Sequence, residues 1–244
     1  MKQQFDNYTE RDLLVWKTLF ERQRENLTDK ASKEYIYALD GMKEVLSADQ
    51  VPNFDKMKGW FESSTGWSIH CVPGLIPVDE FFQVLADKRF PSSTWLRKME
   101  QLDYLEEPDM FHDIFGHVPL LSNPIFSKFM QKFGELGCQH LNDPIKLVQL
   151  QRLYWFTIEF GLIKSNGLKI YGAGIASSFG ESNYCVTDEV EKRNFDVEEV
   201  INTPFHTDAI QTHYVVIESF EQLFDSLDEL SKLWNSKTYD YVLD

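Results

Sequence analysis

The sequence predicts a mainly α-helical domain with a small β component. Apolar residues recur at helical spacing through most of the chain, whereas only a few short apolar runs between turn residues have the character of strands. With 244 residues, 43% of them hydrophobic, the chain can bury a sizeable core. Because no repeat or linker divides it, we expect one domain over residues 1–244, with an N-terminal helical segment (1–66), a motif-bearing core (67–220) and a C-terminal helix and tail (221–244).

The N-terminal half is expected to contain four helices and one short strand. Thr9 and Asp12 resemble a capping box, and apolar residues follow at helical spacing, which predicts a first helix packed on the body. Further helices are expected over residues 32–46, 53–61 and 78–88. Alternation over residues 67–72 predicts a strand that ends at the turn signal Pro73-Gly74.

Prolines mark the next helices. Pro108, Pro124 and Pro144 each follow a polar or acidic residue and precede an apolar-periodic run, which predicts that each occupies the first position of a helix. The third of these helices is expected to be the longest. It should cover residues 144–164, followed by short strands over 168–171 and 214–217, joined by loops, and by a final helix over 220–234.

Charge and cysteine usage narrow the classes of partner. The formal net charge of −15 repels phosphate backbones and anionic lipid headgroups, so we expect neither nucleic acid nor a membrane surface as a partner. No run approaches 18 consecutive apolar residues. Cys71, Cys138 and Cys185 are odd in number and form no C-x-x-C pair, which is typical of free thiols in a reducing cytoplasm.

Two histidines, His112 and His117, form the first chemical signal. A spacing of five leaves them about 140° apart around an ideal α-helix, so they differ from the i, i+4 pair of zinc proteases. They converge only if the helix ends between them. Gly116 and Pro119 are the residues expected to end it, which would place His112 on the last turns and His117 in the loop beyond.

Glu159 is the candidate third group. It lies within a strongly apolar helical run, where an unpaired carboxylate would be unfavourable. Two imidazoles and one carboxylate with open coordination positions form the facial triad of non-haem ferrous oxygenases, so the three residues could hold iron or another divalent metal. The alternative is two ordinary histidines at a helix end and a salt bridge from Glu159 to Arg152 or Lys164.

Three long motifs resemble one known family. They are Glu107-Pro108-Asp109-x-x-His112-x-x-x-Gly116-His117-Val118-Pro119-Leu120, then Tyr154-Trp155-Phe156-Thr157-Ile158-Glu159-Phe160-Gly161-Leu162, then Tyr171-Gly172-Ala173-Gly174-Ile175-Ala176-Ser177-Ser178-Phe179-Gly180-Glu181. In order and spacing they resemble the biopterin-dependent aromatic amino acid hydroxylases, from about residue 72 to about residue 220. The resemblance implies a single aromatic amino acid hydroxylase catalytic domain. It also implies that His112, His117 and Glu159 bind Fe(II) beside a tetrahydropterin.

The resemblance also assigns the surrounding residues. On the pterin side it implies stacking on Phe81, with Leu75 and Ile76 alongside and with Asp113 nearby, where animal members have glutamate. On the substrate side it implies that Arg97 binds the substrate carboxylate, that Asp109 orients Arg97 and that Trp155 forms an aromatic wall. Gly174, Ser177 and Ser178 would lie in a loop that lines the pocket, with Ser177 hydrogen-bonded to His112.

The implied reaction is hydroxylation of an aromatic amino acid with O2. Trp155 and Val216 match the members that convert L-phenylalanine to L-tyrosine, and Asp113 with the short chain points to the bacterial branch. Tyrosine or tryptophan remain alternative substrates, and a zinc hydrolase could use the same triad. A structural-metal protein is a third alternative, but it would need a closed site of four ligands, and the sequence offers no fourth Cys or His nearby. We also expect neither a regulatory domain nor a tetramerising coiled coil, and therefore a cytoplasmic monomer.

Overall fold

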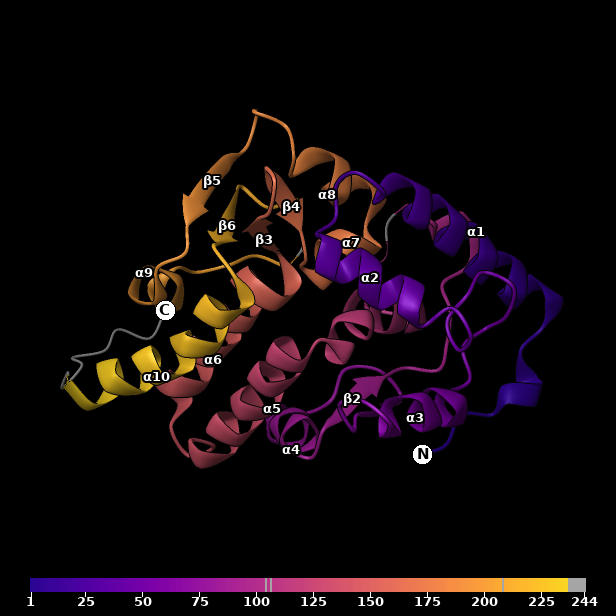
Figure 1. Ribbon diagram of the computed structural model, residues 1–244. Helices are drawn as coiled ribbons and strands as arrows, with labels where there is room; N and C mark the ends of the chain where they lie inside the picture. The colour runs from indigo at the N-terminus through magenta and orange to yellow at the C-terminus, as the bar shows by residue number, and fades with distance from the viewer. Residues whose placement is uncertain (104, 106, 208, 237–244) are drawn as a thin grey trace.

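The fold is described here by a computed structural model that covers residues 1–236 except 104, 106 and 208 (Figure 1). In chain order its helices are α1 (Glu10–Asn26), α2 (Lys33–Gly41), α3 (Phe54–Glu62), α4 (Val78–Ala86), α5 (Pro124–Gln139), α6 (Pro144–Tyr154), α7 (Ala173–Ser177), α8 (Phe179–Tyr184), α9 (Val197–Asn202) and α10 (Phe220–Ser236). Its strands are β1 (Ser68–Cys71), β2 (Arg89–Ser92), β3 (Gly161–Lys164), β4 (Leu168–Ile170), β5 (Glu191–Asn194) and β6 (His213–Ile217). The mainly helical fold class is therefore confirmed.

Two helical segments are wound as π-helices, and three are short 3₁₀ turns. The π segments cover His112–His117 and Trp155–Glu159, and the 3₁₀ turns cover Phe5–Asn7, Met99–Gln101 and Pro119–Ser122. Both π segments continue directly from ordinary helical turns. They contain His112, His117 and Glu159, which the sequence indicates as candidate metal ligands.

The capping box predicted for the first helix is confirmed. The Thr9 hydroxyl accepts the backbone N–H of Asp12, and the Asp12 carboxylate accepts the backbone N–H of Thr9. The helix buries Trp16 completely, and its indole packs edge-on against Phe111 with ring centroids 5.6 Å apart. This contact places α1 against the turn that leads into His112. The helix expected over residues 32–46 is shorter, because α2 ends at Gly41 and turns follow.

A small β-α-β unit follows the N-terminal helices. β1 lies where the strand was expected, but it pairs in parallel with β2, a strand that the sequence analysis missed because Pro91 interrupts it. Parallel neighbours need a crossover, and here the connection includes α4. The unit therefore presents the loop after β1 and one face of α4 to the same side of the molecule.

Two helix boundaries differ from expectation. Pro124 and Pro144 occupy first helical positions as predicted, but Pro108 precedes its helix. There Asp109 caps the helix instead, since its Oδ1 accepts the backbone N–H of His112 at 3.1 Å. The helix expected over residues 144–164 ends at Glu159, and Gly161–Lys164 forms strand β3. A short apolar run fits helix and strand equally well, and pairing with β4 and β6 decides between them.

The second half of the chain folds around a four-stranded sheet in the order β4-β3-β6-β5. β3 pairs antiparallel with β4 and parallel with β6, and β5 pairs parallel with β6. The expected strands β4 and β6 are present, but the segments between them were wrongly expected to be loops. They contain α7, α8, α9 and β5, which are too short to show a periodic pattern.

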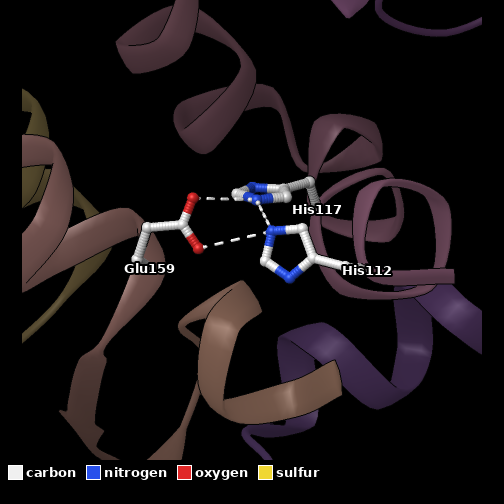
Figure 2. Close-up of side chains that lie close together, drawn as sticks. All are labelled: His112, His117 and Glu159. Carbon is white, nitrogen blue, oxygen red and sulfur yellow. Dashed lines mark hydrogen bonds and ion pairs between the residues drawn. The ribbon is translucent and has the colours of Figure 1, made fainter. Parts of the chain in front are cut away.

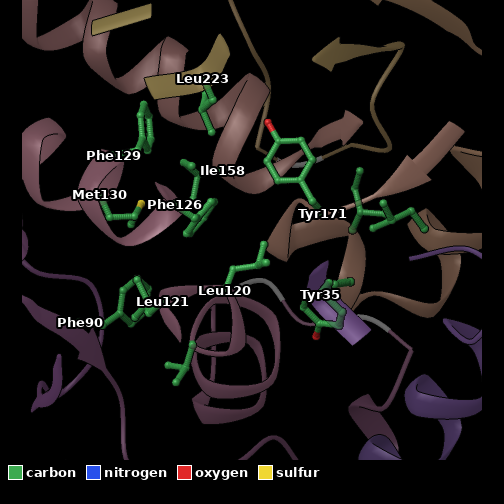
Figure 3. Packing of buried hydrophobic residues seen from close by; sticks show 14 of the residues in the cluster. Tyr35, Phe90, Leu120, Leu121, Phe126, Phe129, Met130, Ile158, Tyr171 and Leu223 are labelled. Carbon is green, nitrogen blue, oxygen red and sulfur yellow. The ribbon is translucent and has the colours of Figure 1, made fainter. Parts of the chain in front are cut away.

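The hydrophobic core connects the two halves. Figure 3 shows Phe126, Phe129 and Met130 of α5 close to Leu223 of α10, with Ile158 of the second π segment nearby. Figure 1 shows α10 running beside α5 and α6. Within the described part of the chain, no helix combines the length and apolarity needed to cross a bilayer.

Candidate metal centre and active-site cavity

The π segment His112–His117 brings the two histidines together. In a π-helix the backbone hydrogen bonds join residues five apart, so side chains at i and i+5 come one above the other. His112 Nε2 and His117 Nε2 lie 3.1 Å apart. The expectation that the helix must end between them is therefore wrong: the helix widens instead, and both histidines remain on it.

Gly116 permits a close approach rather than a helix end. A Cβ atom at this position would lie 2.8 Å from the backbone oxygen of Ala173, at the start of α7. Such a contact is too short for any side chain. Glycine therefore lets α7 pack directly on the histidine segment, and α7 supplies Ser177 to the same site.

Glu159 arrives from the second π segment. The i+5 hydrogen bond from Phe160 N to Trp155 O, 2.9 Å long, marks this widened turn. The Glu159 carboxylate places Oε1 3.1 Å from His117 Nε2 and Oε2 3.6 Å from His112 Nε2 (Figure 2). One ligand atom from each of the three residues lies within 4.8 Å of the other two.

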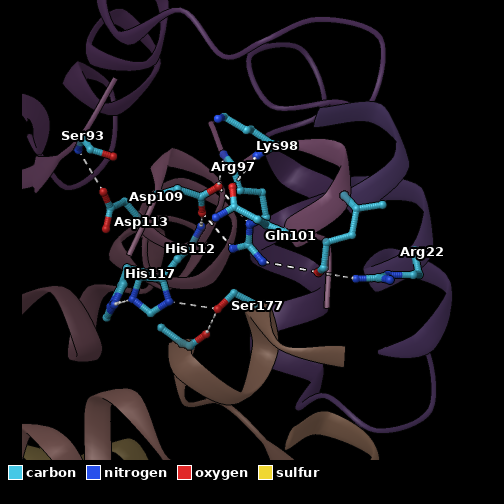
Figure 4. Close-up of polar contacts among 12 residues, drawn as sticks. Arg22, Ser93, Arg97, Lys98, Gln101, Asp109, His112, Asp113, His117 and Ser177 are labelled. Carbon is cyan, nitrogen blue, oxygen red and sulfur yellow. Dashed lines mark hydrogen bonds and ion pairs between the residues drawn. The ribbon is translucent and has the colours of Figure 1, made fainter. Parts of the chain in front are cut away.

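A hydrogen bond to Ser177 determines the tautomer of His112. The Ser177 hydroxyl donates its single proton to the backbone oxygen of Ala173 at 2.8 Å, so it can only accept from His112 Nδ1, 2.9 Å away (Figure 4). Nδ1 therefore carries the ring proton, and Nε2 presents its lone pair to Glu159 and His117. The contact between Ser177 and His112 expected from the resemblance is confirmed.

The donor set suits a cation. Burial lowers the pKa of His112 to about 4, so its ring is neutral near pH 7. Burial by itself raises the pKa of Glu159. The two imidazoles and the hydrogen bonds from His117 and the Gly174 backbone lower this pKa by more than burial raises it, so the carboxylate stays charged. A divalent ion would accept a lone pair from each atom, which fits the preference of ferrous iron for two imidazoles and one carboxylate.

The alternative explanation for Glu159 is wrong. Arg152 donates to the backbone oxygen of Ile201 at 3.1 Å, and Lys164 forms an ion pair with Glu218. Within the described residues, the partners of both basic side chains therefore lie away from Glu159. Among the described residues, the side chains that contact the Glu159 carboxylate are His112 and His117.

A cavity of about 490 Å³ opens beside the three ligand atoms. Its walls combine the β-α-β unit, both π segments and Phe205. The lining residues are Val72, Gly74, Leu75, Ile76, Val78, Phe81, Phe82, Phe90, Pro91, Ser93, Pro108, His112, Asp113, His117, Phe133, Gln151, Tyr154, Trp155, Glu159 and Phe205. Aromatic and aliphatic side chains dominate this list, which is typical of a site for a largely apolar ligand.

All four residues expected on the pterin side line this cavity. Phe81, on α4, packs edge-on against Tyr154 at 5.3 Å, and Ile76 is half-buried beside it. Leu75 is 76% exposed at the mouth. Asp113 lies deeper, where Oδ2 accepts the backbone N–H of Ser93 at 2.8 Å and where burial raises the pKa of its carboxyl to about 7.

Arg97 and Asp109 form a buried bidentate ion pair. Arg97 Nε lies 2.9 Å from Asp109 Oδ2, and Nη2 lies 2.8 Å from Oδ1 (Figure 4). Because Asp109 also accepts the backbone N–H of His112, the pair is tied directly to the histidine segment. This geometry leaves Nη1 of Arg97 with a single long contact, 3.5 Å to the backbone oxygen of Leu102.

Comparison with known proteins identifies this arrangement. The family model of biopterin-dependent aromatic amino acid hydroxylases matches residues 4–240. The chain belongs to this family. Phenylalanine-4-hydroxylases from Chromobacterium violaceum and Ralstonia nicotianae are each 46% identical to it over 228 residues, covering 93% of this chain and 76% and 72% of the relatives.

Solved structures agree with this assignment. The C. violaceum phenylalanine hydroxylase with bound iron(III) and 7,8-dihydrobiopterin has a TM-score of 0.90 and 43% identity, covering 100% of this chain and 90% of the other. An iron- and phenylalanine-bound structure of that enzyme has a TM-score of 0.87 and 40% identity, with 100% and 91% coverage. The resemblance stated from the three sequence motifs is confirmed.

Six of the seven residues that the family resemblance assigned to the substrate lie outside the cavity lining, Arg97 and Asp109 among them, and only Trp155 lines it. Gly174 and Ser177 belong to α7 rather than to a loop, and Ser178 caps α8 by accepting the backbone N–H of Glu181. Gly174 packs against Glu159, since a Cβ atom there would lie 3.2 Å from Oε2. Val216 is buried within β6.

Sequence reasoning missed several residues of this hydroxylase cavity. Tyr154 lies inside the second motif and was read only as an apolar helix position. Phe205 stacks on Trp155 with ring centroids 4.6 Å apart, although 50 positions separate them. Gln211 accepts the indole N–H of Trp155 at 3.0 Å. No local pattern marks Phe205 or Gln211, because only tertiary folding brings them to the cavity.

Proposed function

We propose that this chain is a phenylalanine 4-monooxygenase that uses non-haem Fe(II), a tetrahydropterin and O2 to convert L-phenylalanine to L-tyrosine. The observation that carries the proposal is the convergence of His112, His117 and Glu159 on one wall of a largely aromatic cavity. Family membership supports it, as do the relatives of 40–46% identity, which are phenylalanine-4-hydroxylases.

In this proposal His112, His117 and Glu159 hold the iron, and Ser177 keeps His112 in the tautomer that binds it. When bound, Fe(II) and the reduced pterin supply the electrons for reductive activation of O2. Three protein ligands on one face leave coordination positions open toward the cavity. The apolar lining excludes water from those positions.

The pterin and the amino acid occupy different parts of the cavity. We assign the pterin to the wall formed by Phe81, Leu75 and Ile76, with Asp113 at its inner end. We assign the substrate carboxylate to Arg97, held in place by Asp109, and the substrate ring to the wall formed by Trp155. Gly174, Ser177 and Ser178 support this region from behind the ligand residues.

Phenylalanine is the preferred substrate in this proposal. The Drosophila melanogaster tyrosine 3-monooxygenase is 31% identical to this chain, against 40–46% for the bacterial phenylalanine-4-hydroxylases. Trp155 and Val216, the two positions that distinguish the members in the sequence analysis, favour the same substrate. Tyrosine and tryptophan remain the competing substrates for the test below.

We further propose that the protein acts as a monomer in the cytoplasm, in the breakdown of phenylalanine. Its net charge of −15 disfavours self-association. The three cysteines are free, as expected for a reducing compartment. No interaction with membranes or nucleic acid is proposed for so acidic a chain.

The test is anaerobic loading with Fe(II), followed by O2, tetrahydropterin and an equimolar mixture of phenylalanine, tyrosine and tryptophan. Mass spectrometry should detect tyrosine formation that requires both iron and pterin. If iron is bound but no amino acid is oxidised, the substrate assignment to Arg97, Trp155 and Val216 is wrong. If Zn(II) supports hydrolytic turnover in place of oxidation, the reaction class itself is wrong.

A further inference from the structure

A buried glutamine lies directly behind the aromatic wall of the cavity. Gln211 is only 7% exposed, and its Oε1 accepts the indole N–H of Trp155 at 3.0 Å. Its Nε2 donates in the other direction, to the backbone oxygens of His206 and Ala209 at 3.3 and 3.1 Å. One side chain therefore joins Trp155 to the segment that carries Phe205.

Glu181 anchors this glutamine. Its Oε1 accepts the backbone N–H of Gln211 at 3.2 Å, and its Oε2 accepts the hydroxyl of Tyr214. Glu181 is 8% exposed, and within the described chain its carboxylate contacts a backbone N–H and a hydroxyl rather than a basic side chain. A buried carboxyl group without an ion pair depends on its hydrogen bonds. The two bonds therefore hold Gln211 and Tyr214 at fixed positions around Glu181.

The contacts determine how the wall is oriented. Trp155 lines the cavity, and its ring stacks on Phe205 at 4.6 Å with 20° between the planes. The indole has only one polar group, and Gln211 is its partner. Without that acceptor, the indole N–H would remain unpaired unless the ring turned toward another acceptor, so the hydrogen bond to Gln211 favours the present ring orientation.

We propose that Gln211, anchored by Glu181, is a positioning residue that sets the orientation of the Trp155–Phe205 pair and so determines which aromatic ring the cavity accepts. The inference deepens the proposed function and rests on it. A rigid aromatic wall discriminates between substrate rings because a misplaced ring loses its alignment with the reacting centre. Gln211 itself lies outside the cavity lining and acts only through Trp155 and Phe205.

The chain offers a matched control. Gln149 is 3% exposed and accepts the indole N–H of Trp234 at 2.6 Å, between α6 and α10 and outside the cavity lining. Gln149→Met and Gln211→Met thus delete the same kind of glutamine–indole bond with the same change in side chain. Only the second deletion is adjacent to the cavity, and it also removes the bonds from Gln211 Nε2 to His206 and Ala209. Loss of a buried glutamine–indole bond as such is therefore common to both variants.

The kinetic experiment compares these two variants with the parent chain, each loaded with Fe(II) and tetrahydropterin. We expect Gln211→Met to raise the KM for phenylalanine about three- to tenfold, with kcat changed less than about twofold, and to increase the relative turnover of tryptophan and tyrosine. Gln149→Met should change none of these. Equal KM and selectivity in Gln211→Met and the parent, or equal effects in both variants, would overturn the inference.

A spectroscopic experiment tests the orientation without catalysis. We expect the near-UV circular dichroism of metal-free Gln211→Met to differ from that of the parent, and this difference to disappear when both chains carry Trp155→Phe. A difference that persists in the Trp155→Phe background would contradict a role through Trp155. If Gln211→Met does not fold, Glu181→Ala cuts the same anchor and should shift KM and selectivity in the same direction.

The two levels of the proposal fail in different ways. A parent chain that binds iron but hydroxylates no aromatic amino acid refutes the proposed function, whatever the variants do. A parent chain that is active, with variants that match it in KM, selectivity and near-UV spectrum, refutes only the role of Gln211.

Discussion

At the scale of single residues, the position of the His112 ring proton determines which of its nitrogens can bind a metal. Ser177 gives its hydroxyl proton to Ala173, so His112 must donate from Nδ1 and keep its Nε2 lone pair for a metal. Hydrogen bonds of this kind to metal-binding histidines strongly affect metal affinity. The cluster therefore depends on a residue that contributes no ligand atom.

The ligand residues can be tested one by one. We expect His117→Ala and Glu159→Ala to lose stoichiometric Fe(II) binding and hydroxylation while the fold is retained. Ser177→Ala should weaken Fe(II) binding roughly ten- to a hundredfold. Metal analysis after equilibrium dialysis measures Fe(II) binding, and far-UV circular dichroism shows whether the fold is retained. A fully active variant without iron would contradict the assignment.

Glu181 makes stability depend on pH. Burial raises the pKa of its carboxyl above the ordinary value, so ionisation in the folded state is unfavourable. A raised pKa gives a stabilising contribution that is present at low pH and is lost as pH rises through the folded-state pKa. We therefore expect the stability of Glu181→Gln relative to the parent to increase as the pH rises from the ordinary pKa of glutamate to neutral pH, as measured by urea unfolding.

The neighbours of Glu181 do not obscure this comparison. Burial raises the pKa of Cys185 to about 12 and that of Tyr214 well above its ordinary value, so both stay neutral in this range. A difference between Glu181→Gln and the parent that is constant with pH, or that moves in favour of the parent, would show that Glu181 ionises without penalty.

Val216 combines a prediction about specificity with one about stability. We predict that Val216→Asp raises the turnover of tyrosine relative to phenylalanine. Because Val216 is 4% exposed within β6, the new carboxylate should also destabilise the fold by more than about 2 kcal/mol. Val216→Asn is the neutral control of similar shape. Unchanged relative turnover in Val216→Asp would remove Val216 from the substrate assignment.

At the scale of elements, the two π segments bring His112, His117 and Glu159 together, which ordinary α-helical turns would not do for two histidines five residues apart. Each widened turn lies in the continuation of an α-helical stretch, and each ends at a ligand residue. The sheet then continues from the second segment, since β3 begins at Gly161, two residues after Glu159. Short α7 packs between them because Gly116 and Gly174 have no side chain.

Gly116 tests this packing. A Cβ atom there would lie 2.8 Å from a backbone oxygen of α7, so we expect Gly116→Ala to destabilise the protein by about 2 kcal/mol or more and to weaken Fe(II) binding. Gly59→Ala in α3, where no atom lies within 4 Å, should instead stabilise it by about 0.5–1 kcal/mol. Thermal unfolding and metal titration measure the pair. Similar effects at both glycines would contradict the close approach.

At the scale of the whole molecule, the cavity lies where separate parts of the fold meet. The β-α-β unit supplies the wall that we assign to the pterin, the two π segments supply the three candidate metal ligands, and the chain between α9 and β6 supplies Phe205. Large exposed hydrophobic side chains do occur among the described residues, including Leu14, Tyr37 and Ile210.

The oligomeric state follows from charge in our proposal. With a net charge of −15, we expect light scattering to give a mass near 28.6 kDa and phenylalanine kinetics to be hyperbolic. A tetramer, or cooperative dependence of rate on phenylalanine concentration, would contradict this expectation.

The sequence alone determined the fold class, the family, most helix starts and the three candidate ligand residues, which the structure brings together. Helix caps and proline positions act locally, and each motif is contiguous in sequence, so these features can be predicted without knowledge of the tertiary structure. Residues 237–244, the end of the expected C-terminal tail, lie outside the described structure.

Only the tertiary structure decided how the site is assembled. Whether residues 161–164 form helix or strand depends on pairing with β6, about 50 residues later, and whether His112 and His117 meet depends on a widened turn. The partners of Trp155 are likewise distant in sequence. Such choices are made by packing and hydrogen bonding between remote segments, which outweigh the weak local preferences of short apolar runs.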